Sequence, residues 1–386
     1  MIIDLPETTT SAVNKKLIEL RESGGSVALG RVLTLVIVTD DGVAEEAIRA
    51  ANDASSEHPC RVITIVRGNR RGSSRLDAQI RVGGDAGASE VIVLRLYGPL
   101  ADHGDSVIVP LLLPDAPTVA WWPGVAPERP IDDPIGAMAQ RRITDAAASL
   151  KPIKALEQRA KFHAPGDTDL AWSRVTLWRG LLAAALDQPP YEPVRHAVVT
   201  GGTDSPSGEL LAAWLALYLK CPVTRVRTKA GTGLTGVRLE RTSGVVELIR
   251  PDGAVATLNQ PGQPERRIAL APRADRDCLA EELRRLDPDD IYAEVVVRGL
   301  PLLAKSASAA VVNGNGTASA PKAAAAKTSP AKAPATQTPA AKAPATKAPA
   351  KQSQAAKSPA AKSSAAKSSA AKTPAAKTAP PVADPS

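Results

Sequence analysis

Apolar and polar residues alternate along the first 300 residues in patterns that predict many short strands and helices. Runs of apolar and β-branched residues bounded by Gly, Pro, Asn and Asp indicate strands, whereas apolar residues three and four apart indicate amphipathic helices. Strands are predicted at residues 32–38, 61–66, 76–82, 91–96, 118–122, 197–200, 222–228, 234–240, 244–250, 254–258, 266–271 and 292–297. Helices are predicted at residues 11–22, 43–55, 99–113, 134–142, 151–162, 169–187, 206–220 and 275–286.

The order of these elements indicates an α/β protein. The strand at 32–38 leads through the helix at 43–55 into the strand at 61–66, and such a β-α-β unit favours parallel pairing. A second series of strands and helices starts at His196. We therefore expect two α/β domains with mixed sheets, each of about 150 residues. The predicted domains are residues 1–165 and residues 166–304, the second led by the helix at 169–187.

The composition changes abruptly at residue 305. Residues 305–386 consist almost entirely of Ala, Lys, Pro, Ser and Thr, with almost no large apolar residue to bury, so we expect a disordered tail. Its 12 Lys and single Asp give it a charge of +11 within a formal net charge of +8, which leaves −3 for residues 1–304. The body therefore has no overall positive field for nucleic acid or a membrane. Nonspecific, salt-sensitive binding of nucleic acid would depend on the tail alone.

No metal site, disulfide or cofactor is predicted. Cys60, Cys221 and Cys278 are far apart, and the four His show no metal-ligand spacing. Residues 231–236 match G-x-G-x-x-G by letter, but a strand is predicted after them where a dinucleotide site needs a helix, so we interpret them as a glycine-rich hairpin turn. No signal peptide or membrane-spanning run is visible, and scattered thiols fit a reducing cytoplasm.

Two polar segments are candidates for binding anions. The turn at 200–208 separates a strand from a helix, and backbone N–H groups at a helix start can hold a phosphate or a sugar phosphate. The alternative is an ordinary turn in which Ser205 caps the helix. The candidate residues are Gly201, Gly202, Thr203, Ser205 and Ser207. Four arginines, at positions 67, 70, 71 and 75, either grip an acidic group or form a solvated run of charge.

Two segments combine tryptophan and arginine in a body that is poor in aromatic residues. The chain has five Trp and one Phe, and four of the Trp lie within Pro117–Gly124 and Asp169–Arg179. Trp and Arg dominate protein–protein hot spots, and burial in the core is the alternative. On the helix at 169–187, Trp178 shares the apolar stripe while the arginines flank it and reach outward. We expect a partner-binding surface or its immediate support at Trp121, Trp122, Trp172, Arg174, Trp178 and Arg179.

These segments resemble a known family, the bacterial glucose-6-phosphate dehydrogenase assembly proteins, OpcA. The resemblance covers about residues 1–300 and rests on Trp-Trp-Pro-Gly at 121–124, Asp-Leu-Ala-Trp-Ser-Arg…Trp-Arg at 169–179, His-Pro-Cys-Arg-Val-Ile at 58–63 and Val-Val-Thr-Gly-Gly at 198–202. It implies a non-catalytic factor that promotes the assembly or allosteric activation of glucose-6-phosphate dehydrogenase. It thereby implies a role in the oxidative pentose phosphate pathway and NADPH production, and, in some relatives, regulation through cysteine.

Two other functions stay open at this point. An enzyme acting on a sugar phosphate would use the turn at 200–208 and would need a base, for which His196 is the nearest candidate. A nucleic-acid-binding protein would act through the basic tail at 305–386.

Overall fold

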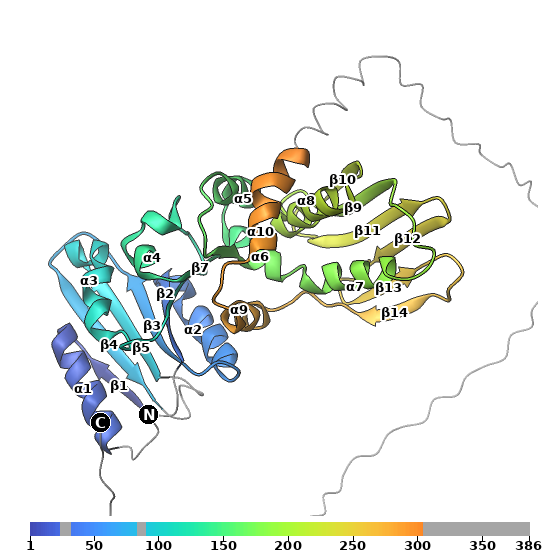
Figure 1. Ribbon diagram of the computed structural model, residues 1–386. Helices are drawn as coiled ribbons and strands as arrows, with labels where there is room; N and C mark the ends of the chain where they lie inside the picture. Colours follow the sequence, from blue (N-terminus) through green and yellow to red (C-terminus); the bar gives the residue numbers. More distant parts are fainter. Residues whose placement is uncertain (24–31, 83–89, 304–386) are drawn as a thin grey trace, which may run out of the picture. The chain divides into compact units, whose positions relative to one another are not determined.

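The computed structural model describes residues 1–23, 32–82 and 90–303 (Figure 1). Within these residues, one sheet of eight strands and another of six are combined with helices, so the predicted α/β class with mixed sheets is confirmed. The predicted disordered tail at 305–386 lies outside the described residues. None of the described helices is long and apolar enough to cross a lipid bilayer.

The first sheet has the strand order β1-β4-β5-β3-β2-β6-β7-β8. From β5 to β8 in this order all neighbours pair in parallel, and β4 and β1 extend one edge with antiparallel pairs. Numbered along the chain, the six parallel strands lie in the order 3-2-1-4-5-6, which is the order of doubly wound dinucleotide-binding sheets. The strands are β1 (Ile2–Leu5), β2 (Leu33–Asp40), β3 (Cys60–Arg67), β4 (Arg75–Arg81), β5 (Glu90–Tyr97), β6 (Thr118–Trp122), β7 (Arg141–Thr144) and β8 (Asp167–Asp169).

Helices cover both faces of this sheet. One face carries α2 (Asp41–Ser55) and α9 (Asp275–Arg284), and the other carries α1 (Thr10–Ser23), α3 (Gly104–Ile108) and α4 (Pro134–Met138). Successive side chains of a strand point to opposite faces, so Trp121 of β6 enters the core under α2 and α9, whereas Trp122 enters the core under α1 and α3. The chain therefore returns to the first sheet near its C-terminus, where α9 packs beside α2 (Figure 1).

The second sheet has the order β10-β9-β11-β12-β13-β14, with one parallel pair, β10 and β9. Apolar residues of α5, α7 and α8 pack with its buried residues in a third core. The strands are β9 (His196–Gly202), β10 (Val223–Thr228), β11 (Leu234–Arg241), β12 (Gly244–Ile249), β13 (Val255–Asn259) and β14 (Arg266–Ala269). The helices are α5 (Pro152–Lys161), α6 (Leu170–Ser173), α7 (Thr176–Leu186), α8 (Pro206–Leu219) and α10 (Asp290–Glu294). Short 3₁₀ segments lie at η2 (Gly98–Asp102), η3 (Val109–Leu111), η4 (Pro130–Asp132) and η5 (Ala146–Ala148).

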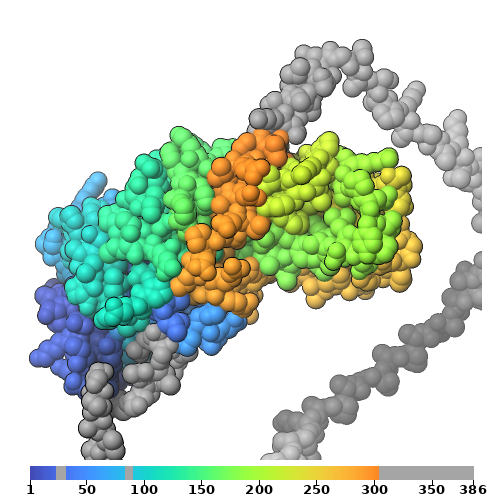
Figure 2. Space-filling model, viewed as in Figure 1, coloured from blue at the N-terminus to red at the C-terminus, as the bar shows by residue number. Residues whose placement is uncertain are grey.

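The strand predicted at 292–297 is wrong, because this segment is helical. α10 continues into a π-helical turn, η6 (Val295–Gly299), whose Val295 and Val296 are buried in the third core. The run of β-branched residues suggested a strand, but the buried positions follow helical spacing. Gly299 fits this packing because an added Cβ would meet the carbonyl oxygen of Ala213 in α8 at 2.9 Å. Figure 2 shows this C-terminal helix as an orange band beside α5 and α8.

The helix predicted at 169–187 is divided into two. Asp169 ends β8 and caps α6, and α7 starts only at Thr176. Val175 leaves the helical conformation, with φ −101° and ψ 5°. The predicted helix at 134–142 is also shorter, because α4 ends at Met138 and the next residues form β7. β7 begins with two buried arginines, which gave the sequence no apolar signal for a strand.

One further expectation is corrected by the topology. Residues 231–236 do not form a hairpin turn, because β10 and β11 both pair with β9 and the loop between them crosses the end of that strand. The division between residues 1–165 and 166–304 stays a prediction, and the first sheet continues beyond it. β8 belongs to the first sheet and α9 packs against it, although both fall within the second predicted range.

The packing of α9 leads to a stability prediction. Leu279 of α9 is fully buried, so Leu279→Ala should lower the free energy of unfolding by about 2–5 kcal/mol through lost apolar contact and a residual cavity. Leu150→Ala is the matched control, because Leu150 is 100% exposed and its truncation should change stability by less than about 0.5 kcal/mol. Chemical denaturation of the full chain measures both. Equal stabilities of the two variants would contradict this packing.

Candidate functional site

The carboxyl edge of the first sheet is the place where a doubly wound fold binds a dinucleotide. The strand order reverses between β2 and β6, and the ligand's pyrophosphate lies at the turn after the first strand. Here β2 ends at Asp40, which occupies the cap position of α2, and Asp41 is the first residue of that helix. This turn reads Thr-Asp-Asp-Gly instead of a glycine-rich fingerprint. Two carboxylates at this position oppose a pyrophosphate by like charge.

Ion pairs cross the same edge. Arg95 of β5 lies 3.5 Å from the Asp41 carboxylate, and Arg67 at the end of β3 lies 3.8 Å from Asp133. Three of the four arginines of the predicted cluster, Arg67, Arg70 and Arg75, have partners within the chain. Arg70 lies 3.4 Å from Asp102, and Arg75 stacks 4.2 Å from the centre of the Tyr97 ring. These arginines therefore neutralise the protein's own acids, and they support the interpretation as a solvated run of charge.

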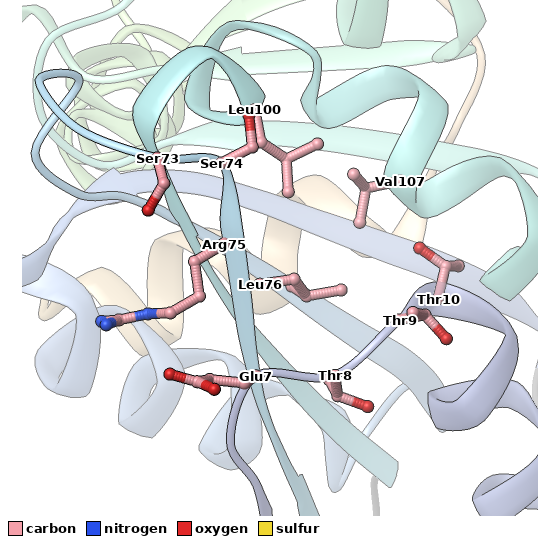
Figure 3. A pocket seen from close by; sticks show the side chains of 10 residues that line it. All are labelled: Glu7, Thr8, Thr9, Thr10, Ser73, Ser74, Arg75, Leu76, Leu100 and Val107. Atoms are coloured by element: carbon pink, nitrogen blue, oxygen red, sulfur yellow. The ribbon is translucent and has the colours of Figure 1, made fainter.

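A hydroxyl-rich cavity of about 500 Å³ lies between the start of α1 and β4 (Figure 3). Thr8, Thr9 and Thr10 line one side of it, and Ser73 and Ser74 lie on the other. The Thr9 hydroxyl accepts a hydrogen bond from the N–H of Ala12 and so caps α1. Leu76, Leu100 and Val107 also line the cavity, which lies at one corner of the sheet, outside the tryptophan–arginine segments.

The segment 169–179 joins the first sheet to the rest of the molecule. Asp169 is completely buried at the end of β8 and accepts hydrogen bonds from Thr144 Oγ1 at 2.7 Å, from Ala146 N at 2.9 Å and from Ala171 N at 3.0 Å. Burial raises the pKa of Asp169 to about 7, and the nearby Asp145 carboxylate adds to this rise while the hydrogen bonds from Thr144 and Ala171 oppose it. A single carboxylate therefore fixes the start of α6.

Arg174 occupies the break between α6 and α7. Its two terminal nitrogens donate to both oxygens of Asp145, at 2.7 and 2.6 Å, and it also bonds to Asp275 at the start of α9, at 2.7 Å. Burial lowers the pKa of Arg174, but the bonds and charges of Asp145 and Asp275 outweigh burial and raise it overall. This fork links η5 to α9 through one guanidinium.

Arg179 and Trp172 form a second contact within the same segment. The Arg179 guanidinium lies 3.6 Å from the centre of the Trp172 ring, and its Nη2 donates to Thr176 Oγ1 at 2.9 Å. Burial lowers the pKa of Arg179, and cation–π stacking on the indole favours its charged form. The Trp172 Nε1–H donates to Asp289 at 2.9 Å, immediately before α10. The expectation that both arginines reach outward is therefore wrong, because each is held by groups of the chain itself.

A buried ion pair connects α9 to β7 beside the same segment. Glu282 of α9 accepts hydrogen bonds from Arg141 of β7 and from the Ser173 hydroxyl, and all three residues are buried. Arg141 also donates to the carbonyl oxygen of Asp287 at 2.7 Å. We refer to residues Arg141, Asp145, Asp169, Arg174 and Glu282 as the joint network. It ties β7, β8, α6 and α9 together.

The four predicted tryptophans are core residues in this structure. Trp121 and Trp172 are each 1% exposed, Trp122 is 0% and Trp178 is 2% exposed. The burial predicted for Trp178 is confirmed, and Arg250 approaches its ring at 5.2 Å. These indoles do not offer contact area to a partner in this conformation. Of the two roles expected for them, support of a surface fits the geometry, and the surface itself does not.

The predicted anion-binding turn is filled by its own hydrogen bonds. The N–H groups of Gly202, Thr203 and Ser205 donate to carbonyl oxygens of the chain, and the Ser205 hydroxyl caps α8 by accepting from Gly208 N at 3.1 Å. The Ser207 hydroxyl donates to the Ala171 carbonyl at 2.9 Å. The Cβ position of Gly201 would lie 2.6 Å from the Gly233 carbonyl, so the crossing loop closes over this turn. The geometry favours the ordinary capped turn over a phosphate site.

The remaining candidate chemistry is sparse. Among the described residues, no group of three or more His, Cys, Asp or Glu is arranged to hold a metal ion. No disulfide joins the three cysteines, which all lie in the described part of the chain, and Cys60 and Cys278 are buried. Burial raises the pKa of Cys278 to about 12 and also raises the pKa of Cys221, so neither thiol is activated as a thiolate near neutral pH.

Comparison with protein families identifies the chain. Residues 51–161 match the family described as the glucose-6-phosphate dehydrogenase subunit N-terminal domain, and residues 165–296 match its C-terminal domain. The two matches follow each other in order and together span more than half of the chain. The chain belongs to the OpcA family of glucose-6-phosphate dehydrogenase assembly proteins. The resemblance carried by the Trp-Trp-Pro-Gly and Trp-Ser-Arg segments is thereby confirmed.

No curated protein sequence gives a significant match to this OpcA-family chain. Among solved structures, it is similar to an oxidoreductase from Sinorhizobium meliloti, with 10% identity, 74% of this chain and 99% of that chain covered, and a TM-score of 0.39. It is also similar to glucose-6-phosphate 1-dehydrogenase from Mycobacterium avium, with 10% identity, 72% of this chain and 93% of that chain covered, and a TM-score of 0.38. A third similar structure is myo-inositol 2-dehydrogenase from Lactobacillus plantarum, with 8% identity, 73% of this chain and 98% of that chain covered, and a TM-score of 0.36.

The raised pKa of Asp169 predicts a pH-dependent stability. The folded carboxyl keeps its proton up to about pH 7, whereas an unfolded one loses it near 3.8, so between these values folding takes up a proton and becomes less favourable as the pH rises. The free energy of unfolding of the natural chain minus that of Asp169→Asn should fall by up to about 1.4 kcal/mol per pH unit between about pH 4 and 7. Above pH 7 it should level off.

Urea denaturation of both chains at a series of pH values measures this difference. Groups that do not interact with position 169 titrate alike in both chains and cancel in the subtraction. A difference that stays constant, or that grows with pH, would show that the buried carboxyl is ionised throughout.

Proposed function

We propose that this chain is a non-catalytic factor that promotes the assembly of glucose-6-phosphate dehydrogenase and raises its activity by an allosteric contact. The observation that carries the proposal is the match of both halves of the chain, in order, to the subunit domains of the OpcA family. The acidic turn at Asp40 and Asp41 supports a non-catalytic role, because it replaces the phosphate-binding glycines that a nicotinamide-dependent enzyme of this topology would need. The proposed site of action is the cytoplasm, where the dehydrogenase would supply NADPH through the pentose phosphate pathway.

An assembly factor acts by binding one state of its client more tightly than another. The joint network suits this task, because paired and buried charges hold α6 and α7 in one arrangement. The outer side of α7 then presents Leu177, which is 47% exposed, next to the open position of Gly180. We assign the client contact to this side of α7, with Trp172, Trp178, Arg174 and Arg179 as its support and with Trp121 and Trp122 in the cores beneath.

The first experiment adds the purified full chain to a purified glucose-6-phosphate dehydrogenase from the same organism. The initial rate of NADP⁺ reduction should rise with added chain and saturate, and the mass of the dehydrogenase assembly measured by light scattering should increase. The chain without the dehydrogenase serves as the control and should reduce no NADP⁺. An unchanged rate together with an unchanged mass at saturating chain would contradict the proposal.

The second experiment tests the assigned contact. Leu177→Asp places a charge on the outer side of α7, so the concentration needed for half-maximal activation should rise by about tenfold or more through loss of apolar contact. Val125→Asp is the matched control, because Val125 is 78% exposed and lies in the loop after β6. Circular dichroism should show both variants folded. If Leu177→Asp activates as well as the control, the client binds elsewhere.

A further inference from the structure

The second sheet has one covered face and one uncovered face. Along its strands buried residues alternate with half-buried or exposed ones, and the buried set packs against α7 and α8. On β9, Ala197 and Val199 are buried, whereas the intervening Val198 is only half-buried. Antiparallel sheets commonly leave one face in water. We call the uncovered side, which carries Val198, Arg238 and Glu247, the open face.

The open face combines apolar and charged side chains. Val198, Val245, Ile249 and Val255 are half-buried there, and Val226 on the edge strand is 43% exposed. Most of its polar groups bond only to one another. His196 contacts Thr224 at 2.9 Å, and Arg238 Nε donates to Glu240 at 3.3 Å. Apolar side chains that stay partly exposed on several neighbouring strands are typical of a protein-binding surface.

Two opposite charges lie side by side at the centre of the open face. Arg238 of β11 and Glu247 of β12 are register partners, and these two strands have two further strands on either side. The Arg238 side chain is 48% exposed. Among the described residues, the Glu247 carboxylate has no ion-pair or hydrogen-bond partner. The centre of the sheet therefore presents a positive group and an unpaired negative group at the same height along neighbouring strands.

We propose that the open face binds the open face of a second copy of this chain. A twofold axis parallel to the strands and placed over the gap between β11 and β12 would lay β11 of each copy over β12 of the other. Because Arg238 and Glu247 share one register level, this single operation would pair Arg238 with the partner's Glu247 twice. Aligned sheets pack about 10 Å apart, a distance that an arginine and a glutamate can span together.

The second copy is favoured over other occupants because the complementarity is internal to one face. The same rotation lays β9 over β13 of the partner, where Val198 would meet Asn259 and Thr200 would meet Thr257, so no like charges face each other beside the central pairs. A different protein would need a matching pattern of its own, and nothing in this chain requires one. The inference is independent of the proposed action on the dehydrogenase, which uses α7 on the covered side of the sheet.

The test is a charge exchange in the full chain. The natural chain should be a dimer by sedimentation equilibrium, and Arg238→Glu or Glu247→Arg alone should weaken the dimer by about tenfold or more, because each places like charges opposite each other twice. The double variant Arg238→Glu/Glu247→Arg restores opposite charges and should recover the natural dissociation constant to within about threefold. Arg298→Glu, on the exposed side of the C-terminal helix, makes the same change of charge off the open face and should have no effect.

Each outcome decides the proposal. A natural chain that stays monomeric at all accessible concentrations overturns it, as does a dimer that neither single variant weakens. A double variant that stays as weak as the single ones also overturns it, since loss without recovery reflects damage to the sheet. If the natural chain is monomeric and Arg238→Glu abolishes activation of the dehydrogenase, the open face belongs to the client. A dimer that leaves the dehydrogenase unchanged would refute the proposed function and leave this inference standing.

Discussion

The buried pair of Arg141 and Glu282 is the constraint on which the arrangement of the chain depends. A carboxylate in a protein interior is tolerated only when it is paired and hydrogen-bonded, since removing one partner leaves a charge that costs several kcal/mol. Glu282 satisfies this requirement only if α9 lies against β7 and against the Ser173 hydroxyl. Apolar packing of α9 on α2 would tolerate some sliding, whereas the charge pair fixes one position. The joint network therefore converts a set of adjacent elements into one defined geometry.

The first sheet has the topology of a dinucleotide-binding fold but different residues at the binding edge. Its strand order is that of a dinucleotide-binding fold, yet the turn after β2 carries Asp40 and Asp41, and Arg95 and Arg67 bridge to acids across the same edge. Fold alone does not define function, which depends on the groups at the site. In this chain the groups at the switch point neutralise each other. The two proposed contacts therefore use binding surfaces away from this edge, the exposed side of α7 and the open face of the second sheet.

Much of the fold could be predicted from the sequence, because its strands are strongly apolar and its turns carry clear Gly and Pro signals. β2, β3, β5 and most of the second sheet follow this rule. The misses have specific causes. β7 begins with Arg141 and Arg142, whose burial is compensated by ion pairs that no local pattern reveals. The helical end at 295–299 consists of β-branched residues, and only contact with α8 decides its conformation.

The residue types of the candidate site could be predicted from the sequence, but the direction in which its arginine side chains point could not. Trp and Arg at 172–179 marked the segment that matters, but their partners Asp145, Asp275 and Asp289 lie between 29 and 117 residues away along the chain. A sequence pattern cannot show that a guanidinium turns inward to meet such distant acids. The prediction of an anion site at the turn 200–208 failed for a related reason. The N–H groups of this turn already donate hydrogen bonds within the chain, among others to the loop that crosses over it.

The return of α9 to the first sheet has a consequence for synthesis. Cys278, Leu279, Ala280 and Leu283 of α9 complete a core whose other buried members come from residues 33–170. This core therefore cannot close on a ribosome until almost the whole folded body has emerged. Contacts of such long sequence separation slow folding and leave an apolar sheet face uncovered in the nascent chain. A product truncated before α9 would keep every strand of the first sheet yet expose that face, which makes it a substrate for chaperones and proteases rather than a shorter working version.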